Sequence, residues 1–172
     1  MSISNLLLSV DTYTDVKCNT IDTNSIIVDN PVYEFVEVNS SGSQSLPNNT
    51  VANLENWAIV QQFGNDIIKS LDNDYDFEVL KDGVYSVQST VSYQPNATGD
   101  RALIIYMNNE NRGHSTQTAV NPADTGATRI QCYARAFLSS GNRIRLAGYQ
   151  TSGAPLLVKD TGLSKLTISR ER

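Results

Sequence analysis

The 172-residue chain has little of the chemistry on which metal sites and acid-base catalysis depend, with one histidine and two cysteines. Cys18 and Cys132 form no CxxC pair and have no neighbouring histidine, so neither a zinc site nor a redox motif is present, and we expect two free thiols. His114 has no second histidine beside it, and Ser139 and Ser140 have no base partner. We therefore expect a protein that is not an enzyme and binds no cofactor.

Long apolar runs are also missing. No stretch approaches the ~20 apolar residues that a membrane span needs. The first residues, MSISNLLLSVDTYTD, lack the basic start and the apolar core of a signal peptide. These features predict no membrane insertion and synthesis in a cytoplasm.

Charge is distributed unevenly along the chain. Residues 1–100 carry 3 basic and 14 acidic side chains, whereas residues 101–172 carry 10 basic and 4 acidic ones, for a net charge of −5. The arginines of the second part are spread through apparent strands instead of clustering in a tail or helix, so we expect no nucleic-acid binding. Attraction between the two halves, within or between subunits, is the preferred interpretation.

Residues 1–30 differ in composition from the rest. They contain short β-prone pieces separated by Asp, Asn and Thr, with too few large side chains to form a core. We interpret them as an N-terminal arm, and residues 31–172 as a separate head. Five apolar residues of the arm are the candidate anchor to a larger assembly: Leu6, Leu7, Leu8, Ile26 and Ile27.

From residue 31 onward the chain shows the two-residue periodicity of half-buried strands. Residues 31–38 and 84–93 alternate between apolar and polar positions, as do residues 129–137, and the run RALIIYM (101–107) is apolar on both faces, as in a central strand. A strand is favoured over a helix around Trp57–Val60 because Gly64 interrupts the segment and β-branched residues are frequent. About eight strands with turn signals between them predict an all-β, antiparallel jelly-roll sandwich.

Three segments, in this order, carry a resemblance to a known superfamily: LKDGVYSVQSTVSY (80–93), RALIIYMNNE (101–110) and LSSGNRIRLAGYQTSGAPLLV (138–158), the last followed by LSKLTIS. They resemble the globular heads of the C1q and tumour-necrosis-factor-like superfamily. The resemblance covers residues 75–170 well, residues 31–74 loosely and residues 1–30 not at all. It implies a ten-strand jelly roll that forms homotrimers and binds proteins or glycans through loops.

Such a head, made without export behind a short arm, resembles a viral or phage structural protein. We expect a homotrimeric fibre head, spike or minor capsid component of a virion, held to other virion proteins by residues 1–30. The alternative is a host-recognition module that binds a receptor or glycan through the 94–100 and 108–126 loops. Candidate contact residues in these loops are Asn96, Asn108, Arg112 and His114.

Two further sets of residues are candidates for binding. Some aromatic and arginine side chains lie at the alternate strand positions that point away from the core. They suit a subunit interface, although surface packing between strands would explain them as well. These are Tyr133, Arg135, Phe137, Arg145 and Tyr149. Asp72, Asp74 and Asp76 have the alternate spacing of a calcium loop, but they lack the glycine and the final acid of an EF-hand, so a solvated acidic turn is preferred.

Overall fold

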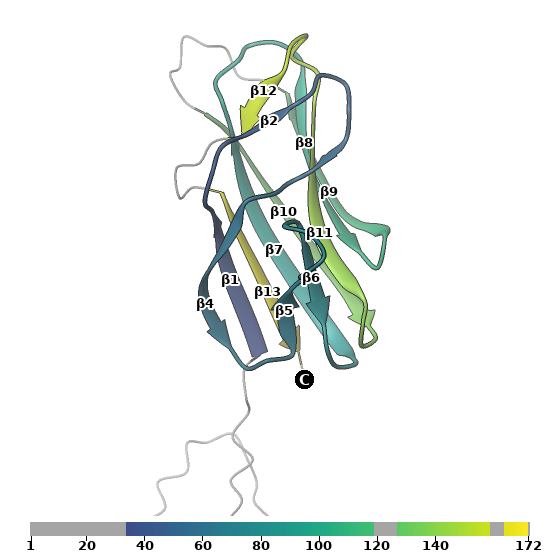
Figure 1. Ribbon diagram of the computed structural model, residues 1–172. Coiled ribbons are helices and arrows are strands. Elements are labelled where there is room, and N and C mark those ends of the chain that lie inside the picture. Colours follow the sequence, from purple (N-terminus) through teal and green to yellow (C-terminus); the bar gives the residue numbers. More distant parts are fainter. Residues whose placement is uncertain (1–33, 119–126, 159–163, 172) are drawn as a thin grey trace, which may run out of the picture. The chain divides into compact units, whose positions relative to one another are not determined.

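A computed structural model describes residues 34–118, 127–158 and 164–171. These residues form two antiparallel β-sheets packed face to face, and the described residues contain no helix (Figure 1). The predicted all-β jelly-roll sandwich is therefore confirmed.

The larger sheet has the strand order β2-β12-β7-β13-β1-β4, and β10 pairs with the remaining edge of β7. Its strands are β1 (Glu34–Ser40), β2 (Gln44–Leu46), β4 (Trp57–Phe63), β7 (Gly83–Tyr93), β10 (Thr128–Leu138), β12 (Leu156–Val158) and β13 (Lys165–Glu171).

The smaller sheet has the order β5-β6-β11-β8-β9, with β3 paired to β11. Its strands are β3 (Ala52–Asn53), β5 (Ile67–Lys69), β6 (Asp76–Val79), β8 (Asp100–Met107), β9 (Glu110–Thr118) and β11 (Arg143–Gln150).

The core lies between the two sheets and follows from the alternation of side chains along each strand. On β7, Tyr85, Val87 and Val91 point inward and are fully buried, and on β10 the inward residues include Ile130 and Ala134. The central strand β8 is buried along nearly its whole length, as its two-sided apolar run predicted. Trp57 is buried at the start of β4, so that segment is a strand, as predicted.

The structure has more strands than the eight inferred from the sequence or the ten implied by the resemblance, with thirteen among the described residues. The additional strands include β2, β3 and β5, each only two or three residues long, which is too short for an alternating pattern to show. The expected loop from residue 108 to 126 was also wrong in part, because residues 110–118 form strand β9.

The two ends of the sandwich are formed by different parts of the chain. Glu34 pairs with Arg170, and Val84 pairs with Glu171, so β1 begins and β13 ends at the Gly83 end of β7. At the Tyr93 end of β7 lie three loops, residues 47–51, 94–100 and 151–155. Figure 1 shows this loop end at the top and the last described residues at the bottom.

Candidate interaction surfaces

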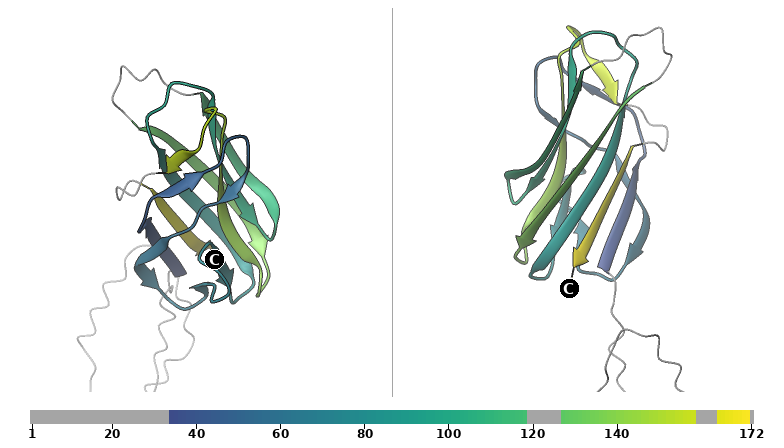
Figure 2. Two further views of the ribbon diagram at one scale, coloured as in Figure 1. Left: turned by 45° about the horizontal axis from the view of Figure 1, so that its top comes forward. Right: turned by 180° about the vertical axis from the view of Figure 1, so that it is seen from behind.

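The larger sheet, seen from behind in Figure 2 (right), has an outward face that we call the open face. This face carries exposed aromatic side chains. Tyr133 and Phe137 project from β10 with 57% and 65% of their surface exposed. Arg135 lies between them in sequence, and its Nε donates to Glu171 Oε2 over 2.8 Å. The Ser86 hydroxyl donates to the same carboxylate. The hydrogen bonds from Arg135 and then Ser86 hold the pKa of Glu171 below its usual value.

Short polar side chains occupy the middle of the open face. Tyr133 pairs with Gln88 of β7, and Gln88 pairs with Thr167 of β13. On the far side, Phe35 of β1 stacks on Phe63 of β4 with ring centroids 5.2 Å apart. Aromatic rings thus flank a strip of small polar groups, and this combination of Tyr, Phe and Arg is typical of protein interfaces.

Strand β4 forms one edge of the larger sheet and exposes apolar side chains. Ile59, Val60 and Phe63 are all exposed, and the register with β1 shifts between Glu37 and Val38, opposite Val60. Within the described residues β4 pairs only with β1. An apolar edge strand is a favourable place for another chain to pair.

Two of the five predicted interface residues lie elsewhere. Arg145 and Tyr149 belong to β11 of the smaller sheet, whereas Tyr133, Arg135 and Phe137 are on the open face of the larger one. Arg145 lies 5.4 Å from the ring centroid of Tyr106 and donates to Asn109 Oδ1 over 2.5 Å. Placing all five side by side was wrong, because strand parity gives the direction of a side chain but not the sheet to which its strand belongs.

Tyr149 is also not the exposed aromatic residue that its parity suggested. It is half-buried, and its hydroxyl donates to Asn49 Oδ1 over 2.6 Å. Its contact is therefore local and belongs to the loop end of the sandwich.

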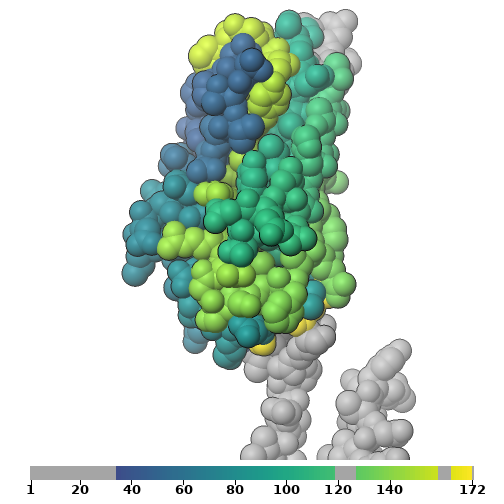
Figure 3. All heavy atoms as spheres, turned by 90° about the vertical axis from the view of Figure 1, so that its right-hand side faces the viewer, coloured from purple at the N-terminus to yellow at the C-terminus, as the bar shows by residue number. Residues whose placement is uncertain are grey.

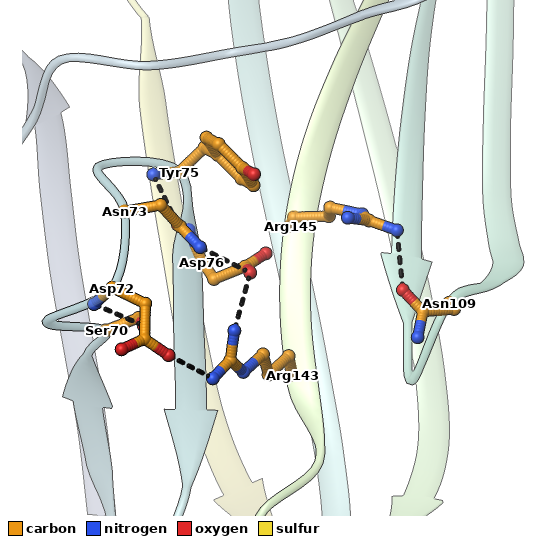
Figure 4. A network of polar contacts seen from close by, with 8 residues as sticks. All are labelled: Ser70, Asp72, Asn73, Tyr75, Asp76, Asn109, Arg143 and Arg145. Carbon is orange, nitrogen blue, oxygen red and sulfur yellow. Dashed lines mark hydrogen bonds and ion pairs between the residues drawn. The ribbon is translucent and has the colours of Figure 1, made fainter.

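The acidic turn before β6 is neutralised by basic side chains of the same chain (Figure 4). Arg143 of β11 reaches Asp72 Oδ2 at 2.6 Å and Asp76 Oδ2 at 3.4 Å, while Lys69 lies 3.2 Å from Asp74. The Asn73 side chain closes the turn by accepting from the backbone N–H of Asp76. No group of three potential metal ligands occurs among the described residues, so the three aspartates do not converge as a calcium site.

The predicted receptor-loop residues fall in three different settings. Asn96 lies in the 94–100 loop, and Asn108 occupies the β8–β9 turn with a φ of 52°. Arg112 and His114 are not loop residues, because both lie in strand β9, where their side chains are exposed. Within the described part of the chain, the His114 ring hydrogen-bonds only to the Thr116 hydroxyl, over 3.0 Å.

The loop end of the sandwich contains two buried polar residues that the sequence did not single out. Arg101 is 0% exposed, and its guanidinium donates to the carbonyls of Asn96, Thr98 and Asp100 at 2.9 to 3.2 Å. Gln150, its register partner on β11, donates to the carbonyls of Leu46 and Ala154 and accepts from Ser152 N. Desolvation lowers the pKa of Arg101. The sequence feature that could have identified this residue is a charged side chain at the start of the apolar run RALIIYM.

The same end is tied together by hydrogen bonds between loops. Thr151 N donates to Asp100 O at 3.0 Å, Gly153 N to Asn48 Oδ1 at 2.8 Å, and Asn49 N to Gln150 O at 2.8 Å. We call the 47–51, 94–100 and 151–155 loops together the pinned end. In Figure 3 the blue loop after β2 and the yellow-green turn after β11 lie against each other at the top of the head.

The remaining predicted features concern the thiols, the membrane and the arm. Cys132 is a free, buried thiol whose pKa is raised by burial. In the parts of the chain that the structure describes, no helix could cross a membrane. Cys18 and the anchor candidates Leu6, Leu7, Leu8, Ile26 and Ile27 lie outside the described residues.

Comparison with solved structures identifies the architecture. The chain is similar to murine APRIL at pH 8.5, with a TM-score of 0.60 and 12% identity over 81% of this chain and 99% of that one. It is also similar to murine APRIL at pH 8.0 (TM-score 0.59, 14% identity, 81% and 99%) and to Eiger TNF from S. frugiperda (0.54, 15%, 81% and 93%). The fold is a TNF-like jelly roll. No protein-family profile and no curated protein sequence matches the chain. The fold implied by the sequence resemblance is confirmed.

Proposed function

We propose that this TNF-like jelly roll is the head of a non-enzymatic, homotrimeric virion protein, a fibre head, spike or minor capsid component held to its particle by residues 1–30. The open face is the observation that carries the trimer. It leaves Tyr133 and Phe137 more than half exposed beside Arg135, and large exposed aromatic groups on a soluble head mark an interaction surface.

A trimer places two different surfaces of each copy in contact, because a three-fold ring is closed by head-to-tail interfaces. The open face serves as one of these two surfaces. On this face Arg135 pairs with Glu171 and Lys165 lies 4.0 Å from Glu37, so these four charges have partners within one chain when the face is covered.

The non-enzymatic and virion parts of the proposal rest on different observations. Among the described residues the His114 ring hydrogen-bonds only to Thr116, and the acidic groups of the 72–76 turn are paired with Arg143 and Lys69, which supports a binding role and not catalysis. The virion assignment rests on the sequence of residues 1–30, whose short apolar pieces suit docking to a larger assembly.

The trimer is tested by light scattering on the full chain. The wild type should have about three times the monomer mass of 18.9 kDa, and the double substitution Tyr133→Asp/Phe137→Asp should give the monomer mass with unchanged strand content by circular dichroism. Leu71→Asp is the matched control, since Leu71 is an exposed apolar residue in the 70–75 loop, away from the open face, and it should leave the trimer intact. A monomeric wild type at micromolar concentration contradicts the proposal.

Host recognition through the head is the second candidate function. It is favoured by the pinned end, where buried polar residues hold three loops in fixed positions at the end of the head opposite Glu34 and Glu171.

A further inference from the structure

We infer that the pinned end is a carbohydrate-binding site that recognises uncharged, hydroxyl- and acetamido-bearing sugars through the side-chain amides of Asn48, Asn49 and Asn96. This inference rests on the recognition function named above, because it assigns that function a surface and a ligand class. It requires neither the trimer nor the virion.

The first argument is preorganisation. The 94–100 loop is held by three carbonyl contacts from one guanidinium, that of Arg101, and the 151–155 turn by both ends of the Gln150 amide. The loops are then bonded to one another through Asp100 and Thr151, and through Asn48 and Gly153. A surface fixed before it meets its ligand loses less conformational entropy on binding.

The second argument is that this rigidity is obtained at an energetic cost that the core does not require. Arg101 is fully buried, its three hydrogen-bond acceptors are carbonyls and not carboxylates, and its Nε has no hydrogen-bond partner. Burying a guanidinium is unfavourable, and desolvation lowers the pKa of Arg101 despite the opposing attraction of Asp100. Through its three hydrogen bonds Arg101 stabilises the conformation of the 94–100 loop.

The third argument is the chemistry that the loops expose. Asn48, Asn49 and Asn96 each use Oδ1 as an internal acceptor, from Gly153 N, Tyr149 Oη and Thr98 N respectively. Each side chain is thereby held in one orientation, and its amide NH2 group has no acceptor among the described residues. Three fixed pairs of N–H donors favour a ligand rich in oxygen acceptors, as hydroxyl and acetamido groups are.

Charge and small apolar groups narrow the ligand class further. Asp100 is the only ionisable residue in the three loops, so the surface offers no exposed cation to a phosphate or a polyanion. Ala97, Ala154 and Pro155 of the same loops are exposed and can pack against the C–H face of a sugar ring. Within the sandwich the pinned end lies opposite Glu34, the first described residue.

The test uses the full chain made in bacteria, so that the Asn48 and Asn96 sequons remain unmodified. An array of neutral, N-acetylated and sialylated oligosaccharides is probed, and the affinity of each bound sugar is then measured by calorimetry. Asn48→Asp and Asn96→Asp keep an oxygen acceptor for the internal hydrogen bond but remove the amide donors. Each should weaken binding of a neutral sugar by about tenfold. Asn111→Asp, an exposed asparagine on β9, is the matched control and should leave affinity unchanged.

Binding of a neutral or N-acetylated sugar that is weakened by both loop substitutions and not by Asn111→Asp supports the inference. It is overturned if the array captures no sugar, if only sialylated sugars bind, or if the two loop variants bind as tightly as the wild type. Light scattering on the same samples separates this outcome from the proposed trimer. A trimer that binds no sugar contradicts only the site, whereas a monomer that binds sugar contradicts only the trimeric function.

Discussion

Arg101 shows how a single buried side chain can set the shape of a surface. It is followed on β8 by four buried apolar residues, Ala102 to Ile105. Its guanidinium donates to three carbonyls, those of Asn96, Thr98 and Asp100, and Asp100 O also accepts from Thr151 N. Arg101 therefore takes part in the packing of the sandwich and also holds the 94–100 loop.

The substitution Arg101→Met should separate these two contributions. It fills similar volume and removes the buried charge, but it leaves the carbonyls of Asn96 and Thr98 without the Arg101 donor, while Asp100 O keeps its hydrogen bond from Thr151 N. We expect a net loss of about 1–3 kcal/mol in the free energy of unfolding, because each lost acceptor partner outweighs the relief of desolvation. Urea denaturation measures it. Arg112→Met, on the exposed face of β9, should stay within about 0.5 kcal/mol of the wild type.

Gly99 and Gly141 offer a matched pair for the packing of the pinned end. Both have a positive φ, 72° and 84°, so an alanine at either position takes up the same backbone strain of about 1 kcal/mol. A Cβ on Gly99 would lie 1.9 Å from the carbonyl oxygen of Thr151, whereas a Cβ on Gly141 meets nothing within 4 Å.

Gly99→Ala should therefore destabilise the head by at least about 2 kcal/mol more than Gly141→Ala in thermal or urea unfolding. Equal effects of the two substitutions would show that the 94–100 loop moves freely past Thr151, and would remove the packing on which the preorganised site depends.

At the scale of elements, strands with alternating or continuously apolar residues were predictable, whereas a strand of polar residues was not. β10 and most of β7 alternate, and β8 is apolar on both sides, so their residues alone indicate their burial. β9 consists almost entirely of polar residues, ENRGHSTQT, because it lies at a sheet edge and only Gly113 is buried, so it resembled a loop. Alternation could not reveal it.

The candidate surfaces were likewise predictable from the sequence only in part. The exposure of Tyr133 and Phe137 follows from their parity on β10, which the sequence shows. The separation of Arg145 and Tyr149 from them does not, because it depends on which distant strands pair. The pinned end was missed for a similar reason, since the bonds from Gln150 to Leu46 and from Gly153 to Asn48 join residues about a hundred positions apart.

The Glu171 carboxylate links three strands of the open face, and this link should depend on pH. Arg135 of β10 and Ser86 of β7 bond to Glu171 at the end of β13, and they lower its pKa in the folded state. The stabilisation is complete above the unfolded-state pKa of about 4.3 and is lost as pH falls through the lower folded-state pKa.

Glu171→Gln should accordingly be less stable than the wild type at pH 7, and the difference should shrink as the pH falls from 7 to 3. Urea denaturation at the two pH values and at one protein concentration measures it. Arg135→Gln should reproduce the same trend, since it removes the first cause of the shift. A difference between wild type and Glu171→Gln that stays constant from pH 7 to pH 3 would show that the carboxylate does not stabilise the open face through its charge.

At the scale of the whole molecule, the two ends of the described sandwich differ. β1 begins and β13 ends at one end of the sandwich, and the pinned end lies at the other. The open face runs along the side between them. A protein that is attached through residues near Glu34, associates through its side and recognises a ligand at its far end would use each of these three regions once.

Removal of residues 1–33 tests this division of roles. The core lies entirely within residues 36–168, and its side chains pack against one another, so the truncated chain should keep its free energy of unfolding within about 1 kcal/mol and its oligomeric mass, apart from the loss of the removed residues. Incorporation into particles should be lost, because the proposed anchor residues Leu6, Leu7, Leu8, Ile26 and Ile27 are removed. Denaturation, light scattering and quantification of the protein in purified particles give the three readouts. A truncated chain that no longer folds would make residues 1–33 part of the sandwich, and one that enters particles at the normal copy number would place the anchor in the head.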